Sequence, residues 1–366
     1  MEEWIKCPLG DILNFRRGHD LPKTSMVPGD IPVAGSNGII GFHNVSTPIS
    51  PCITIGRSGN VGTPYIYDIC WAHNTVLYID DYKGNDPKYL YYLLKTLPLA
   101  SFGGGSAVPT LNRNHIHPME VIFCKDTELQ KKIAGILSKI DDKIELNRQI
   151  NDNLEQQAQA AFNNFLAKYS ECETINLSEI ATLNPKRTIT KGTLARSIEM
   201  AQLPTSGSFP AGWDMKEYNG GMKFQNGDTL MARITPCLEN GKVAYINFLE
   251  ENEVAFGSTE YIVIASKGAI APEVFYFLTR HNDFVDFAVK NMNGSSGRQR
   301  VSAETIGTYK LPVISPEDMV MLETIAKEAL NKIKYNSLEN IRLSEMRDTL
   351  LPKLMSGELK INEIDC

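Results

Sequence analysis

The chain has 366 residues, of which 42% are hydrophobic and 22% are charged, a composition typical of a soluble globular protein with two or three domains. Its formal net charge is −6 at pH 7, and no long segment has more basic than acidic residues. The composition therefore excludes a strongly basic nucleic-acid-binding protein, so that any such binding must come from local clusters. Without a signal peptide or a run of 18 apolar residues, the sequence predicts a cytoplasmic protein that does not bind membranes.

Residues 1–125 are predicted to form a first domain that mixes strands and helices. β-Branched and aromatic residues at 31–34, 52–56 and 76–79, separated by turn-forming Gly, Asn and Pro, predict short strands. A helix is expected over 87–97, where a proline occupies an early helical position. A glycine-rich segment and one more strand complete the domain.

Residues 126–170 are predicted to contain a long helix, because seam residues recur at alternating spacings of four and three over more than four heptads. About 40 helical residues make a rod of roughly 60 Å, which is too long to bury its seam within one domain. The helix therefore needs a partner helix. The seam residues that we expect to make the pairing are Ile133, Leu137, Ile140, Ile144, Asn147, Asn151 and Leu154.

Residues 171–315 repeat the plan of the first domain. The opening LSEI at 177–180 matches LGDI at 9–12. The elements expected after this opening are strands at 227–233 and 261–265, a helix at 271–278 and a strand at 309–314.

Residues 316–366 are predicted to form a second long helix and a short tail, with Pro352 ending or kinking the helix. Moving the first seam by 189 positions gives a second seam that includes Leu322, Ile333, Asn336, Asn340, Leu343 and Leu350. Both asparagines thus recur at the same heptad positions, where a buried Asn costs stability but sets the register of a coiled coil. Two unrelated amphipathic helices are the alternative, but they do not explain the matched asparagines.

The sequence therefore predicts an α+β fold in the order domain, helix, domain, helix. Two similar mixed α/β domains are separated by a long antiparallel two-helix coiled coil, which gives the chain a pseudo-two-fold internal repeat.

No catalytic motif is present: the sequence lacks GxxxxGK[ST], HExxH and GxSxG, and no strand is followed by GxGxxG. The pair His115 and His117 has no neighbouring third ligand, so we expect surface or structural histidines and no metal site. The glycine runs at 103–105 and 294–297 do not lead into a helix with Lys-Ser/Thr, which makes nucleotide binding a poor explanation.

Basic and amide-bearing residues cluster in the expected loops of both domains. Arginine can form a bidentate contact with guanine, Asn and Gln with adenine, and lysine suits phosphates, so these clusters favour DNA binding over an ordinary solvated surface. Two different domains at a fixed separation predict an asymmetric, bipartite target with an unread spacer. The candidates are Arg16, Arg17, His19, Lys23, Arg57, Ser58, Asn60, Ser106, Asn112 and Arg113 in the first domain, and Lys186, Arg187, Lys191, Arg233, Thr235, Arg298, Gln299 and Arg300 in the second.

The sequence resembles the DNA specificity (S) subunits of type I restriction-modification systems. The resemblance depends mainly on MARITPCLENG at 231–241 and LPKLMSG at 351–357, supported by GRSGNVG at 56–62, GSTE at 257–260 and QKKIA at 130–134. Residues 1–125 and 171–315 would then be target-recognition domains 1 and 2, and the two helices would be spacer helices.

The resemblance implies a non-catalytic subunit that binds double-stranded DNA and scaffolds two modification (methyltransferase) subunits. Those subunits would bind S-adenosylmethionine and methylate adenine, and two restriction subunits that use ATP and Mg²⁺ could also join. No cofactor would be bound by this chain itself. The second helix begins PEDMVM at 316–321 without the QKKI pattern of the first, so the equivalence of the two docking sites stays open.

Two other function classes compete with this interpretation. A DNA adenine methyltransferase would need an (Asn/Asp)-Pro-Pro-(Tyr/Phe) loop, and the nearest match is only Asn184-Pro185-Lys186. A two-headed coiled-coil adaptor that binds proteins would show no DNA binding, whereas a DNA reader should bind and weaken steeply with rising salt.

Overall fold

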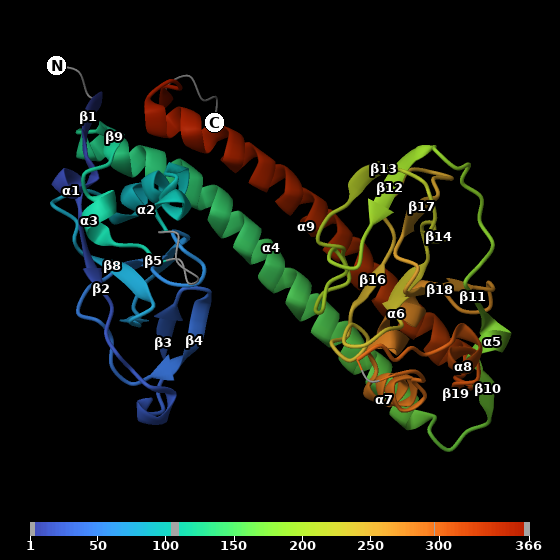
Figure 1. Cartoon of the computed structure of the whole chain (residues 1–366). Coiled ribbons are helices and arrows are strands. Elements are labelled where there is room, and N and C mark those ends of the chain that lie inside the picture. The colour runs from blue at the N-terminus through green and yellow to red at the C-terminus, as the bar shows by residue number, and fades with distance from the viewer. Residues whose placement is uncertain (1–3, 104–109, 296, 362–366) are drawn as a thin grey trace. The chain divides into compact units, whose positions relative to one another are not determined.

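The computed structural model describes residues 4–103, 110–295 and 297–361 (Figure 1). The chain forms two compact units: unit 1 contains residues 1–143 and 342–366, and unit 2 contains residues 144–341. The unit boundaries cross two long helices, α4 (Thr127–Lys168) and α9 (Pro316–Ser356), so each unit contains part of both. In the parts of the chain described, no helix combines the length and apolar character needed to cross a membrane.

Unit 1 is built on a four-stranded antiparallel sheet whose central strands are buried. Its strand order is β2 (Asn14–Arg17), β8 (Val76–Asp81), β5 (Cys52–Gly56) and β6 (Pro64–Tyr67). A second sheet has the order β4 (Gly38–His43), β3 (Ile31–Gly35) and β7 (Trp71–Ala72), with β3 and β7 parallel, and β1 (Trp4–Pro8) pairs with β9 (Glu120–Cys124). Its helical elements are α1 (Leu9–Ile12), α2 (Pro87–Thr96), α3 (Arg113–Ile116) and the 3-10 turns η1 (Lys23–Ser25) and η2 (Leu99–Phe102).

Local sequence signals explain the ends of the helix that covers this sheet. Asp86 caps α2 by accepting the Tyr89 amide hydrogen at 2.8 Å, and Pro87 occupies the first turn, where no amide donor is needed. Tyr89, Leu90 and Leu93 then pack into the core of unit 1.

Unit 2 contains a sheet of the same order as the main sheet of unit 1. It runs β11 (Ala181–Leu183), β18 (Tyr261–Ser266), β15 (Thr229–Ala232) and β16 (Val243–Tyr245), again with antiparallel neighbours. A second sheet has the order β13 (Asp214–Glu217), β12 (Leu194–Ile198), β17 (Ala255–Gly257) and β14 (Met222–Phe224), and β10 (Thr174–Asn176) pairs with β19 (Lys310–Pro312). The shorter helices are α5 (Leu177–Ile180), α6 (Glu273–Arg280), α7 (Asn282–Lys290) and α8 (Ala303–Gly307).

The two units are copies of one plan. The parallel pair β3–β7 of unit 1 has its counterpart in the parallel pair β12–β17 of unit 2, and α1, α2 and α3 correspond to α5, α6 and α8. The predicted α+β class and internal repeat are confirmed by this shared order. Strand β14 and helix α7 are additions of unit 2 that the sequence analysis did not predict.

The long helices α4 and α9 run antiparallel within each unit, and all their predicted seam residues are buried or half-buried. In unit 2, Asn147 Nδ2 donates to Asn340 Oδ1 at 2.9 Å, and Asn336 Nδ2 donates to Asn151 Oδ1 at 2.8 Å. In unit 1, Arg347 donates to Asp141 at 2.7 Å, which explains the one charged residue at a seam position. The two asparagine pairs show why both positions recur together.

The second helix was predicted to end or kink at Pro352, and the prediction that it ends there is wrong. Helix α9 continues through Pro352 to Ser356, because Leu351, Leu354 and Met355 are buried in the core of unit 1. The burial of these three side chains compensates for the amide donor that proline lacks.

Candidate nucleic-acid interface

Unit 1 gathers several of its candidate DNA-binding residues around one open hollow of about 380 Å³. Its lining residues come from the end of β2, the segment after β5, strand β8 and the start of α3. They are Arg16, Arg17, Arg57, Leu77, Thr110, Leu111, Asn112 and Arg113.

Backbone hydrogen bonds hold these segments together. The Arg57 amide donates to Thr75 O at 2.8 Å, and the Leu111 amide donates to Arg57 O at 2.7 Å. Asn112 caps α3 by accepting the Asn114 amide hydrogen, and Arg113 Nη1 donates to a β2 carbonyl at 3.1 Å. The hollow is therefore built on anchored backbone at the edge of the main sheet.

The charge of this hollow is strongly positive. Arg16 makes no side-chain hydrogen bond or ion pair with any residue that the structure describes, and Arg57 Nη1 has only a long contact of 3.5 Å to Asn74 O. Arg17 lies 3.6 Å from Asp20, but both side chains are exposed, so water screens this ion pair. Because no acidic residue is among those that line the hollow, it is suited to bind an anion such as a phosphate group.

The remaining candidates of the first domain do not line this hollow. His19 packs against Trp71 and Tyr78, with ring centroids 5.4 and 5.7 Å away. Lys23 is exposed in η1, Ser58 forms a β-bridge with Thr110, and exposed Asn60 accepts the Thr63 hydroxyl hydrogen. Ser106 lies outside the described residues.

The histidine pair of the first domain is divided between two environments. His117 is half-buried and its Nε2 accepts the Phe15 amide hydrogen at 3.1 Å, whereas His115 is exposed. Burial lowers the pKa of His117, and nearby Arg113 and Lys83 add to the shift. Within the described ranges, no group of three or more His, Cys, Asp or Glu residues could hold a metal ion.

Arg233 of unit 2 occupies the same place as Arg57 of unit 1. Its amide donates to Glu260 O at 3.0 Å, and the Val301 amide donates to Arg233 O at 3.0 Å. Both arginines thus directly follow a central strand, β15 or β5, and both are bonded to the residue before the cap of a short helix.

Arg233 and Arg300 converge on one carboxylate in unit 2. Arg233 Nε donates to Glu260 at 3.1 Å, and Arg300 Nε and Nη2 donate to Glu260 at 2.8–3.0 Å. The Arg300 hydrogen bonds lower the pKa of Glu260 against the opposing effect of burial, and Arg233 contributes to the same shift. The cluster therefore holds an ionised Glu260 between two guanidinium groups.

Other candidates of the second domain are less uniform. Lys186, Lys191 and Arg298 are exposed, while the Thr235 amide and hydroxyl both donate to Gln299 O, at 3.1 and 3.4 Å. The backbone of Gln299 thus fixes the 298–300 segment beside the residues after β15.

Arg187 has a structural role in place of the predicted exposed one. Its Nη2 donates to both carboxylate oxygens of Asp228, at 2.5 and 2.7 Å, and only 12% of its side chain is exposed. Burial raises the pKa of Asp228 to about 6, although the Gln225 amide and Arg187 oppose the shift. The pairing with Asp228 could not be predicted from the sequence, because Asp228 follows Arg187 by 41 positions and only the fold joins them.

Glu260 was also absent from the candidates. Basic and amide-bearing residues are the types expected to contact DNA, and a carboxylate that holds arginines is not one of them. The available signal was GSTE at 257–260, which the family resemblance singled out as a motif.

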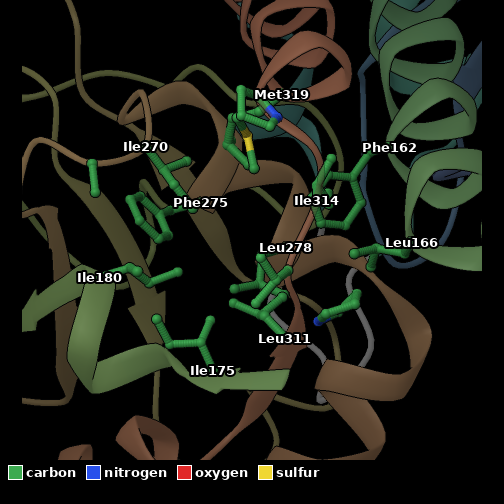
Figure 2. Close-up of a pocket in the computed structure, with 15 residues that line it drawn as sticks. Phe162, Leu166, Ile175, Ile180, Ile270, Phe275, Leu278, Leu311, Ile314 and Met319 are labelled. Atoms are coloured by element: carbon green, nitrogen blue, oxygen red, sulfur yellow. The ribbon is translucent and has the colours of Figure 1, made fainter. Parts of the chain in front are cut away.

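An apolar cavity of about 300 Å³ lies elsewhere in unit 2 (Figure 2). Phe162 and Leu166 of α4 face Leu278 of α6 and Leu311 of β19 across it. All of its lining residues are apolar, so it lacks the convergent polar groups that orient a substrate.

The sequence is similar to known specificity subunits of type I restriction enzymes. Residues 1–156 match the family described as the type I restriction modification DNA specificity domain. The chain is 24% identical over 312 residues to the type I restriction enzyme HindI specificity subunit of Haemophilus influenzae, a match that covers 64% of this chain and 68% of that protein. It is 22% identical over 312 residues to the MjaIX specificity subunit of Methanocaldococcus jannaschii, covering 76% and 70%.

A solved structure shares the fold of the whole chain. The crystal structure of the type I restriction-modification system S subunit from M. genitalium matches with a TM-score of 0.64 and 19% identity, covering 96% of both chains. The likeness extends through the second unit, beyond the 156 residues that the family description covers.

Proposed function

We propose that the chain is a member of the type I restriction-modification DNA specificity family, and that it reads a bipartite, asymmetric DNA target with two target-recognition domains. Like the specificity subunits it resembles, it is a DNA-recognition subunit and not the catalyst of the complex. The observation that carries the proposal is the equivalent placement of Arg57 and Arg233 in the two units.

Each arginine is anchored at its backbone and lies among other candidate DNA-binding groups. In unit 1 the neighbours of Arg57 are three more arginines, whereas in unit 2 the neighbours of Arg233 are Glu260 and Arg300. Different side chains on a shared scaffold would read different bases. The two half-sites are therefore expected to differ.

The long helices support a second part of the proposal, in which they set the length of the unread spacer between the half-sites. Their matched asparagine pairs would hold the two helices in one register, and a spacer of constant length requires a constant register.

The proposed partners are double-stranded DNA, two modification subunits and two restriction subunits. S-Adenosylmethionine would bind to the modification subunits, and ATP and Mg²⁺ to the restriction subunits, so no cofactor is assigned to this chain. Positive charge on the partners would compensate for the net charge of −6. A complex that acts on the DNA of its host would work in the cytoplasm.

Titration of the full-length chain with duplex DNA at several salt concentrations tests the proposal. We expect weak binding by the chain alone, with log K falling linearly as log salt rises. Arg16→Ala should reduce the slope by about one, because it removes one cation from the hollow. Lys139→Ala is the matched control, since it removes the same charge from an exposed position on α4.

Three results would contradict the proposal. Absence of DNA binding at low salt would favour the protein-binding adaptor, and equal slopes for both variants would remove the hollow from the interface. Methylation of DNA by the chain without partner subunits would show that it is itself an enzyme.

A further inference from the structure

The two equivalent arginines have different neighbours at one position of the shared scaffold. The residue whose carbonyl accepts the arginine amide hydrogen is Thr75 in unit 1 and Glu260 in unit 2. Unit 2 therefore has a carboxylate beside its central arginine where unit 1 has a neutral hydroxyl residue.

The hydrogen bonds of this cluster divide the two arginines of unit 2 into two roles. Arg300 donates through Nε and Nη2 to Glu260 and through Nη1 to Arg298 O at 3.2 Å, so its guanidinium is fully engaged. Arg233 donates to Glu260 through Nε only, and its Nη1 and Nη2 make no hydrogen bond with any described residue. About a third of the Arg233 side chain is exposed, so this free pair of nitrogens can reach a ligand.

We propose that Glu260 is a positioning residue that, together with Arg300, holds Arg233 for bidentate contact with a guanine of the second half-site. The proposal rests on the proposed function. A free Nη1/Nη2 pair matches the O6 and N7 acceptors that guanine presents in the major groove. Glu260 fixes the guanidinium plane before DNA arrives, which reduces the entropy lost on binding.

The net charge of the cluster explains why Arg300 accompanies Arg233 and Glu260. A single carboxylate beside Arg233 would cancel its positive charge, whereas one carboxylate between two arginines leaves the cluster with a net charge of about +1. The cluster thus keeps its attraction for DNA while the orientation of Arg233 is restricted.

The contrast with unit 1 makes the inference specific. Arg57 is beside Thr75 and shares its hollow with Arg16, Arg17 and Arg113, with no carboxylate among the lining residues. Replacing Glu260 should therefore alter the reading of the second half-site and leave the first unchanged.

The test is selection of bound sequences from a randomised duplex library by the full-length chain co-purified with its modification subunits. Wild-type protein should select a bipartite site with guanine at one position of the second half-site. Arg233→Lys should reduce the preference for that guanine by between about 5-fold and 150-fold, the range for a lost bidentate pair. Glu260→Gln should reduce it by about 10-fold, while affinity for unrelated duplex DNA rises because a negative charge is removed.

A double variant separates positioning from general damage. If Glu260 acts through Arg233, Arg233→Lys with Glu260→Gln should lose no more guanine preference than Arg233→Lys alone. Arg298→Ala is the control, because this exposed neighbour should weaken binding to all sequences equally.

Additive losses in the double variant, or an unchanged guanine preference in Glu260→Gln, would overturn the inference while the proposed function stands. A wild-type site without guanine in its second half would do the same. A wild-type complex that selects no bipartite site would instead contradict the proposed function, and the inference with it.

Discussion

Individual arginines of the chain differ in the groups that accept hydrogen bonds from their guanidinium nitrogens. Arg187 is engaged by buried Asp228, Arg300 is engaged by Glu260, and Arg16 and the outer nitrogens of Arg233 are open to a ligand. The same residue type is thus buried in an ion pair, held by a carboxylate or left open, depending on the partner that the fold supplies.

Arg187→Ala should destabilise unit 2 by about 3–5 kcal/mol at neutral pH, because it leaves the buried Asp228 carboxylate without its cation. The loss should shrink as the pH falls toward about 6, the Asp228 pKa with Arg187 in place, because without that cation the carboxyl takes up its proton at a higher pH and then needs no partner. Urea unfolding at several pH values measures both effects. Exposed Lys186→Ala is the control, and an equal effect of the two variants would contradict the structural role of Arg187.

His117 should make the stability of unit 1 depend on pH. Its pKa is lowered from 6.5, so on acidification the unfolded chain takes up a proton before the folded chain does. The stabilising contribution is therefore fully present above the unfolded value and is lost as the pH falls through the folded-state pKa. Urea midpoints should fall between about pH 7.5 and about pH 5.5, and His117→Asn should reduce that fall. A fall of equal size in His117→Asn and in the exposed control His115→Asn would show that His117 does not cause it.

Residue roles were only partly predictable from the sequence. Arg16, Arg17, Arg57, Asn112 and Arg113 were selected as candidates, and the structure brings them to one hollow. The ion pairs that separate reading from structural arginines join residues far apart in the chain, and no local pattern encodes them.

The long helices show how a sequence pattern becomes a specific element. Heptad spacing and the recurring asparagines were sufficient to predict two helices in antiparallel contact, and the structure adds the partners. Asn147 is 1% exposed and Asn336 is 3% exposed, so the Nδ2 group of each donates to side chains of the helix interface and not to bulk water, whereas Asn147 Oδ1 is buried without a partner among the described residues.

Asn147→Leu should cost about 1–3 kcal/mol, because it leaves the Asn340 carbonyl oxygen without its donor in a half-buried seam. Replacing Asn147 and Asn340 together by Leu should recover most of this loss, since apolar pairs pack well in a seam. Urea unfolding of the two single variants and the double variant measures the coupling. Losses that simply add in the double variant would mean that the two amides do not act as a pair.

Other elements followed from local signals to different degrees. Turn residues and short β-branched runs predicted the main strands, and proline at Pro87 marked the start of α2. Helix α7 was not predicted, because its nine residues follow the end of α6 after a single residue. In the sequence, only a separate N-terminal start for each helix would distinguish two helices from one.

The chain as a whole combines two copies of one order of strands and helices with two long helices. The repeat was visible in the sequence as element order and as the offset of 189 between the seams, although identity between the copies is low. The division into compact units differs from the four predicted segments, because each unit contains part of both helices. The assignment of the four segments as two target-recognition domains and two spacer helices stays a prediction.

In the proposed function, this chain directs adenine methylation to two unlike half-sites separated by a fixed, unread spacer. Mapping modified adenines across the host genome, with and without the gene for this chain, tests it most directly. We expect one asymmetric bipartite motif that disappears when the gene is deleted and changes in its second half alone in Arg233→Lys. A continuous or palindromic motif, or a motif that survives the deletion, would contradict it.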